Sequence, residues 1–167
     1  MQLSDIELKI KNEIEAIPQQ SRKEGWEWKR GTWTKTIKKK LYEIAKENGF
    51  LVAASGCEGT DQGEWLYDMV WYEKKDRYID RVPLVLESEL NSPDYDLDDD
   101  FFKLLLARAD CRVWIFERKT EQQVKESFNS CIEAIRQFSQ SQKGDRYLML
   151  GVDWNPREFQ SELYVHT

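Results

Sequence analysis

Four acidic side chains stand at period-two spacing in two apolar segments of the chain and could bind a metal ion. Glu64 and Asp68 lie in the first segment, and Glu87 and Glu89 end the second. Side chains alternate between the two faces of a strand, so each pair is expected to share a face. If the segments pair, Asp68, Glu87 and Glu89 come together, and their repulsion favours raised pKa values or a bound cation. Mg²⁺ or Mn²⁺, which prefer oxygen ligands, would relieve that repulsion.

The composition excludes the chemistry that depends on histidine. The only histidine is His166, the residue before the last. Catalytic triads need an internal imidazole, and the common zinc enzymes need histidine ligands. Cys57, Cys111 and Cys131 are odd in number and widely spaced, which predicts free thiols in a reducing compartment. Any catalysis therefore depends on carboxylates, lysines, tyrosines and a metal ion.

The net charge of −6 conceals two oppositely charged segments. Residues 22–40 carry eight basic and two acidic side chains, whereas residues 58–100 carry fourteen acidic and four basic ones. The basic segment predicts contacts with a nucleic acid, DNA in particular. The candidate contact residues are Lys29, Arg30, Lys35, Lys38 and Lys39. Tryptophans 26, 28 and 33 either stack bases there or anchor the segment on the core. The alternative is that both charged segments are solvated faces.

The length of 167 residues predicts a single domain, 1–167, with a core of its own. No apolar run approaches the ~20 residues that span a bilayer. The N-terminus has neither the basic start nor the apolar centre of a signal peptide, which predicts a cytoplasmic protein. A homodimer is an open alternative to a monomer.

Hydrophobic periodicity and turn residues divide the chain into alternating elements. The predicted helices cover 3–16, 34–48, 99–109 and 121–137, and the predicted strands cover 50–54, 64–72, 82–88, 112–116 and 146–153. Pro18 is expected to end the first helix, residues 73–80 to form a polar turn, and Pro156 to begin a short tail. Three successive strands followed by alternation predict an α/β (α+β mixed sheet) fold with helices on both faces. Residues 1–34 form an extension, 35–117 the core, and 118–167 a C-terminal helix, strand and tail.

The order helix, strand, strand, strand, helix, strand over 35–117 resembles the PD-(D/E)xK nuclease superfamily, whose core is restriction-endonuclease-like. The superfamily signature is an Asp on one strand and (Asp/Glu)-x-Lys on the next, often with a Glu on the first helix. The resemblance implies that Asp68 and Glu87 are the metal ligands beside the Ser88 carbonyl, and that Glu43 matches the helical Glu. Glu89 stands where Lys is expected, and Lys103 on the following helix is the natural substitute. The chain also resembles a group of uncharacterised bacterial members of the superfamily, with Glu-x-Glu in place of (Asp/Glu)-x-Lys.

The resemblance implies a Mg²⁺- or Mn²⁺-dependent nuclease that hydrolyses phosphodiester bonds in nucleic acid. Asp68, Glu87 and Glu89 would hold the ion, and Lys103 would stabilise charge at the scissile phosphate. The main alternative is a catalytically inactive nuclease-fold protein that binds nucleic acid or protein; a small-molecule hydrolase is a third. Without the resemblance, Glu87 and Glu89 could stand at a solvated strand end, and Lys103 could be an exposed partner of Asp99.

Overall fold

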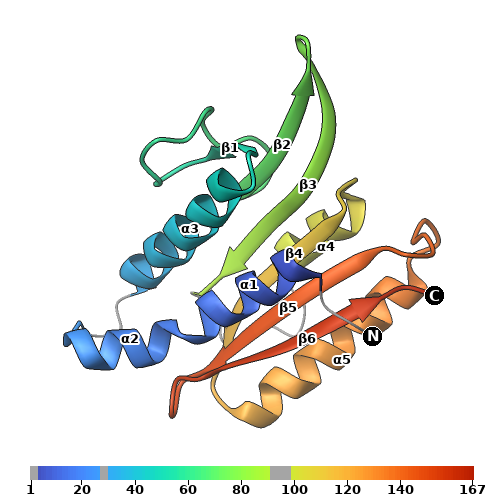
Figure 1. The fold of residues 1–167 in the computed structure, drawn as a ribbon. Helices are drawn as coiled ribbons and strands as arrows, with labels where there is room; N and C mark the ends of the chain where they lie inside the picture. The colour runs from blue at the N-terminus through green and yellow to red at the C-terminus, as the bar shows by residue number, and fades with distance from the viewer. Residues whose placement is uncertain (1–3, 27–29, 91–98) are drawn as a thin grey trace.

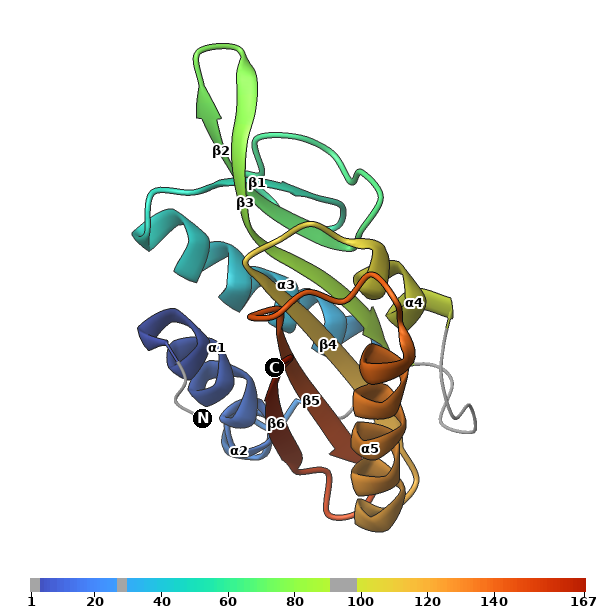
Figure 2. The ribbon, with the colours of Figure 1, turned by 90° about the vertical axis from the view of Figure 1, so that its right-hand side faces the viewer.

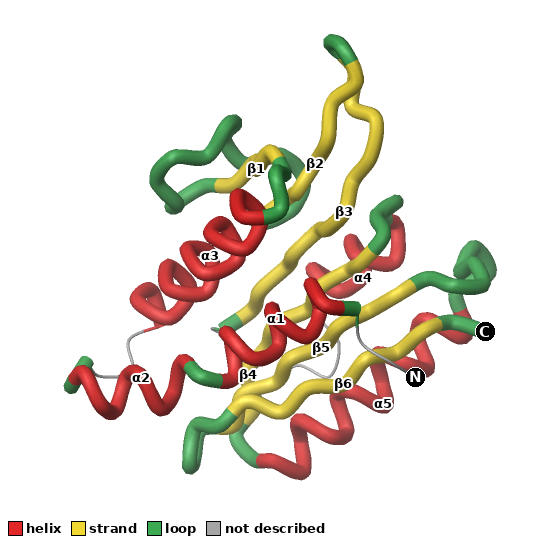
Figure 3. Tube along the Cα trace, viewed as in Figure 1, coloured by secondary structure: helices red, strands yellow, loops and turns green. Residues whose placement is uncertain are grey.

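A single six-stranded mixed sheet forms the centre of the computed structural model, which describes residues 4–26, 30–90 and 99–167 (Figures 1 and 3). The strands are β1 (Leu51–Ala54), β2 (Met69–Lys75), β3 (Tyr78–Glu89), β4 (Cys111–Arg118), β5 (Arg146–Asp153) and β6 (Phe159–Val165). They lie side by side in the order of the sequence. β1, β2 and β3 are antiparallel neighbours, β3, β4 and β5 are parallel, and β6 runs antiparallel to β5. The predicted mixed sheet is therefore confirmed.

Helices cover both faces of the sheet, as the sequence predicted (Figure 2). The helices are α1 (Asp5–Glu15), α2 (Ile17–Glu24), α3 (Arg30–Glu47), α4 (Asp99–Leu106) and α5 (Glu121–Gln137). The first three pack on one face through residues such as Ile14 and Leu41. The last two pack on the other through Leu104 and Phe128. The predicted element order, helix, strand, strand, strand, helix, strand, is present from α3 to β4.

The N-terminal helical region continues past the proline that was expected to end it. Ser4 caps α1 and forms a capping box with Glu7. Pro18 lies in the first turn of a second helix, α2, rather than after the last turn of the first. A proline is tolerated there because the N–H that it lacks has no partner within the helix. The first helix ends at Glu15, within one residue of the predicted bound, but a second helix begins at Ile17 that was not predicted. Proline can both stop and start a helix.

The second strand begins later than predicted and runs further. Residues 64–68 lie outside any strand, and β2 starts only at Met69. The segment before it is tied to β1 through Gln62, whose carbonyl accepts the N–H of Ala54. Beyond Glu73, the expected polar turn is mostly strand, and the turn shrinks to the residues around Asp76, whose φ is 57°.

The C-terminal elements match the prediction except at the end of the chain. α5 and β5 have the predicted bounds. The expected tail is instead a sixth strand, β6, paired along its whole length with β5. The middle of β6 is polar and only partly buried. Its sequence therefore lacks the hydrophobic alternation that predicts a strand. Among the described residues, no helix is long and apolar enough to cross a bilayer.

Candidate active site

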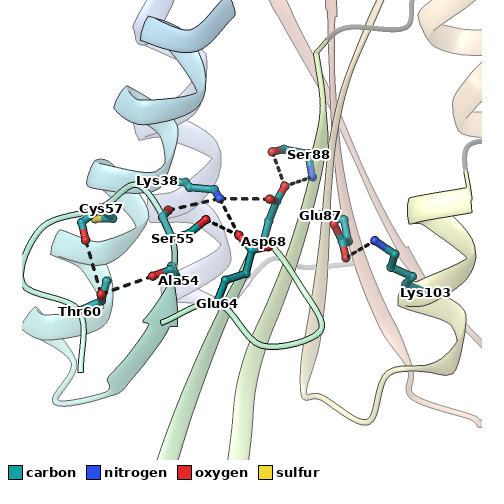
Figure 4. A network of polar contacts seen from close by, with 10 residues as sticks. All are labelled: Lys38, Ala54, Ser55, Cys57, Thr60, Glu64, Asp68, Glu87, Ser88 and Lys103. Carbon is teal, nitrogen blue, oxygen red and sulfur yellow. Dashed lines mark hydrogen bonds and ion pairs between the residues drawn. The ribbon is translucent and has the colours of Figure 1, made fainter. Parts of the chain in front are cut away.

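Asp68 is fixed at the carboxyl end of β3 by hydrogen bonds to Ser88 (Figure 4). Met69 pairs with Leu86 in the ladder, so Asp68 stands directly before the point where β2 joins β3. Its Oδ2 accepts the backbone N–H of Ser88 at 2.9 Å and the Ser88 hydroxyl at 2.7 Å. The side chain thus takes an N–H that the neighbouring strand leaves unpaired, which sets the position of this carboxylate.

The second oxygen of Asp68 faces a buried lysine on α3. Lys38 Nζ lies 3.1 Å from Asp68 Oδ1 and 3.6 Å from Glu64 Oε2, and it donates to the Ser55 carbonyl at 3.4 Å. The Ser55 hydroxyl in turn donates to Glu64. Only 7% of the Lys38 side chain is exposed. An ammonium buried this deeply requires a carboxylate partner, and Asp68 is the nearest one.

The role of Lys38 differs from the surface contact that the sequence suggested. It lies next to Ile37 and three residues before Leu41, both fully buried on the apolar stripe of α3. The helical spacing therefore carried a signal that position 38 faces the sheet. The net charge of the surrounding segment concealed that signal, and Lys38 is not available as a surface contact to phosphate.

Glu87 is buried on the opposite side of β3, where α4 covers the sheet. The residue is 3% exposed. Its Oε1 forms an ion pair with Lys103 Nζ at 3.4 Å. Within the described part of the chain, this oxygen accepts no hydrogen bond. Burial and then the negative charge of Asp68 raise the pKa of Glu87 to about 7, while Lys103 acts in the opposite direction. This carboxyl can therefore gain or lose a proton near neutral pH.

Lys103 contacts two carboxylates, Glu87 of β3 and Asp100 of its own helix. Besides Glu87, its Nζ contacts Asp100 Oδ1 at 2.5 Å, one helical turn earlier. The hydrogen bond to Asp100 is the main cause that raises the pKa of Lys103, and Glu87 adds to it. The ammonium is thus charged at neutral pH and half-exposed to solvent.

The site contains two lysine–carboxylate pairs rather than one cluster of carboxylates. Glu87 and Ser88 are consecutive strand residues, so their side chains point to opposite faces. Asp68 bonds to Ser88 and Lys38 on the α3 side, whereas Glu87 meets Lys103 on the α4 side (Figure 4). The two carboxylates still interact, because Asp68 raises the pKa of Glu87. The expected convergence on one face fails because Asp68 precedes β2 instead of lying within it.

The remaining predicted acidic residues take different positions. Glu89 is half-buried, two residues beyond Glu87 on the same strand. Within the described residues, Glu64 contacts the site through Lys38 and Ser55. Glu43 is exposed on α3 with its Oε1 3.9 Å from Lys39 Nζ. Within residues 4–26, 30–90 and 99–167, no group of three or more His, Cys, Asp or Glu side chains is placed to hold a metal ion.

The basic N-terminal segment is only partly described. Lys35 and Lys39 are exposed on α3. Lys29 lies outside the described residues, and of Arg30 only the backbone, at the start of α3, is described. Trp33 is 2% exposed and packs against Phe159, with 5.7 Å between ring centroids. This tryptophan anchors α3 on the core, so at this position the core interpretation holds over base stacking.

Comparison with known proteins adds no assignment to this geometry. No protein-family model, no curated protein and no solved structure matches the chain. The function must therefore be argued from the positions of Asp68, Glu87 and the two lysines.

Proposed function

We propose that this protein is a divalent-metal-dependent nuclease, which hydrolyses phosphodiester bonds in nucleic acid on a PD-(D/E)xK core. The observation that carries the proposal is the position of Glu87, a buried carboxyl flanked by Asp68 and by Lys103 at the end of β3. The run of elements from α3 to β4 supports it, because that order is the one in the resemblance. A buried acid with its pKa near neutrality beside an ammonium is typical of catalytic sites.

The side chains present offer Mg²⁺ or Mn²⁺ one buried carboxylate, that of Glu87, as a direct ligand. Glu87 Oε1 is buried and receives no hydrogen bond within the described residues, so it is an acceptor that a cation would satisfy. Mg²⁺ in phosphoryl-transfer sites is commonly held by one or two carboxylates, with water and substrate oxygens completing its shell. Glu87 would hold the ion directly on the α4 side of β3, together with water and substrate oxygens, while Asp68 on the α3 side would add its negative charge.

Each residue of the site would then have a distinct task. A bound ion would act as a Lewis acid on the phosphate and activate a water molecule as the nucleophile. Lys103, half-exposed beside Glu87, would offset the negative charge that develops on the phosphoryl oxygens. Lys38 and Ser88 would hold the Asp68 carboxylate in a fixed orientation. Glu89, further along β3, would line the approach to the site.

A specific observation favours the second candidate, a catalytically inactive nuclease-fold protein that binds nucleic acid or protein. Both oxygens of Asp68 already accept hydrogen bonds, from Ser88 and from Lys38. Glu87 likewise has Lys103 within ion-pair distance. The charges of the site are therefore balanced by the protein itself, and in this candidate the lysines take the place of a metal ion.

Thermal unfolding with and without metal ions separates the two candidates. In the nuclease, Mn²⁺ at about ten times its dissociation constant would stabilise the folded state by about 1.4 kcal/mol and raise Tm by roughly 3–6 °C. Glu87→Gln should remove that increase, and Glu133→Gln, an exposed carboxylate change on α5, should retain it. Cleavage of plasmid and single-stranded DNA should depend on the same ion and stop in EDTA. Identical melting curves with and without millimolar Mn²⁺ would favour the binding protein.

A further inference from the structure

The strands β2 and β3 continue beyond the rest of the sheet as a two-stranded ribbon, residues 73–81 (Figures 1 and 2). β1 pairs with β2 only as far as Tyr72, and β4 pairs with β3 only from Leu84. The side chains of residues 74–81 are all exposed. An isolated two-stranded ribbon gains little stability from its own contacts. Its length is therefore not explained by the core.

The tip of the ribbon combines cations with an exposed aromatic ring. Lys75 and Tyr78 are cross-strand partners, so they share a face. The Arg77 guanidinium lies 4.9 Å from the centre of the Tyr78 ring and donates to the Tyr78 hydroxyl at 2.7 Å. Tyr78 is nevertheless 62% exposed. On the other face, Lys74 extends over the ring of Tyr72, 5.6 Å from its centre.

The positive charge of the ribbon favours a polyanion as its binding partner. Residues 74–81 carry four basic and two acidic side chains, a local charge of +2 in a chain whose net charge is −6. Arg81 is paired with Asp110 at 2.5 Å, and the other three cations lie nearer the tip. A two-stranded ribbon fits the major groove of duplex DNA, where lysine and arginine contact phosphates and base edges.

We infer that the ribbon is an arm that binds double-stranded nucleic acid, and this inference rests on the proposed nucleic-acid substrate. Tyr78 and Glu87 are nine residues apart on the same strand, a separation of about 30 Å in extended chain. One turn of duplex DNA is about 34 Å long. A ribbon seated in the groove would therefore contact the duplex roughly one helical turn from a phosphodiester bond at Glu87, and it would hold the substrate in register with the site.

The test measures binding of fluorescent DNA duplexes by anisotropy in EDTA, where no metal-dependent cleavage occurs. Lys75→Ser/Arg77→Ser should bind a 24-base-pair duplex at least about tenfold more weakly than wild type. The slope of log K against log salt should become shallower by about 2, since each phosphate that the arm no longer neutralises accounts for about 0.9. An 8-base-pair duplex, too short to reach the arm and the site together, should bind the wild type more weakly than the 24-base-pair duplex does. Lys125→Ser/Lys143→Ser removes the same charge from exposed positions on α5 and in the α5–β5 loop, and it should behave as wild type.

A second pair of variants tests the aromatic residue at the tip. Tyr78→Ser should weaken binding of the long duplex, whereas Ile79→Ser, at a neighbouring position that is 50% exposed, should not. All six mutated residues are exposed, so unchanged melting temperatures should accompany the weaker binding. The inference is overturned if the wild type does not bind the duplex, if it binds a single strand of equal length as tightly, or if the two double variants have equal affinities. If duplex binding depends on the ribbon but no cleavage occurs, the arm is supported and the proposed nuclease function is contradicted. If Lys75→Ser/Arg77→Ser cleaves DNA with an unchanged KM, the nuclease function is supported and the arm is contradicted.

Discussion

Lys103 of α4 meets the buried carboxylate of Glu87 on β3, with 3.4 Å between Nζ and Oε1. Position 89 of β3, where the proposed relationship to the PD-(D/E)xK nucleases expects lysine, carries Glu89. The positive charge beside Glu87 therefore comes from the following helix. Lys103 therefore lies where it could take the place of the lysine expected at position 89. Its catalytic role can be tested directly.

Lys103→Met should lower the rate of metal-dependent DNA cleavage by about 100-fold or more, because it removes a cation placed at the developing negative charge. The increase in Tm with Mn²⁺ should remain, since Asp68 and Glu87 are intact. Single-turnover cleavage of a labelled duplex measures the first effect, and thermal unfolding measures the second. Lys125→Met, which removes an exposed ammonium of α5, is the matched control. Equal cleavage rates for wild type and Lys103→Met would show that Lys103 has no catalytic role and serves as the ion-pair partner of Asp100.

The raised pKa of Glu87 makes the stability of the metal-free protein depend on pH. Its pKa is about 7 in the folded protein against an ordinary value of 4.5. Between these values the folded state binds more protons than the unfolded state, so the free energy of unfolding falls as pH rises through this range. The full effect is at most about 3 kcal/mol.

Glu87→Gln should remove this dependence, because the amide is neutral at every pH. The variant should gain stability relative to wild type, and the gain should be larger at pH 8 than at pH 5. Urea unfolding in EDTA at both pH values measures the difference, with Glu133→Gln as the exposed control. Wild-type and Glu87→Gln stabilities that change in parallel with pH would contradict a buried, raised-pKa carboxyl.

The Lys38–Asp68 pair should contribute to stability as a coupled unit. Lys38→Met and Asp68→Asn should each destabilise the protein, and a double-mutant cycle should give a coupling energy of about 1–3 kcal/mol. The reason is that either single change leaves a poorly solvated charge without its nearest partner, at 3.1 Å. The exposed pair Lys9–Glu47 is the control cycle, with an expected coupling of less than about 1 kcal/mol. A coupling near zero for Lys38–Asp68 would show that Glu64 and Ser55 satisfy Lys38 by themselves.

The elements with strong internal periodicity were determined by the sequence. α5 and β5 have the predicted bounds, and the mixed sheet with helices on both faces follows from the predicted order. The apolar spacing of these segments specifies both the type of element and the buried face. Elements that depend on a neighbour for their stability were missed. β6 is polar and exists as a strand because β5 offers it an edge, and the ribbon consists of residues that looked like a turn.

The candidate site divides in the same way. The sequence by itself indicated Asp68 and Glu87, because carboxylates in apolar segments are costly to bury and need a compensating charge. Lys103 was expected there only through the resemblance to the nuclease superfamily. Only the tertiary structure decided which charge compensates which carboxylate. It turns Asp68 toward Ser88 and the buried Lys38 of α3, and it places Glu87 beside Lys103 of α4. Such pairings join residues 16 to 30 positions apart, and their geometry depends on how helices pack against the two faces of the sheet. Local spacing, which specifies a face but not the element that covers it, cannot determine them.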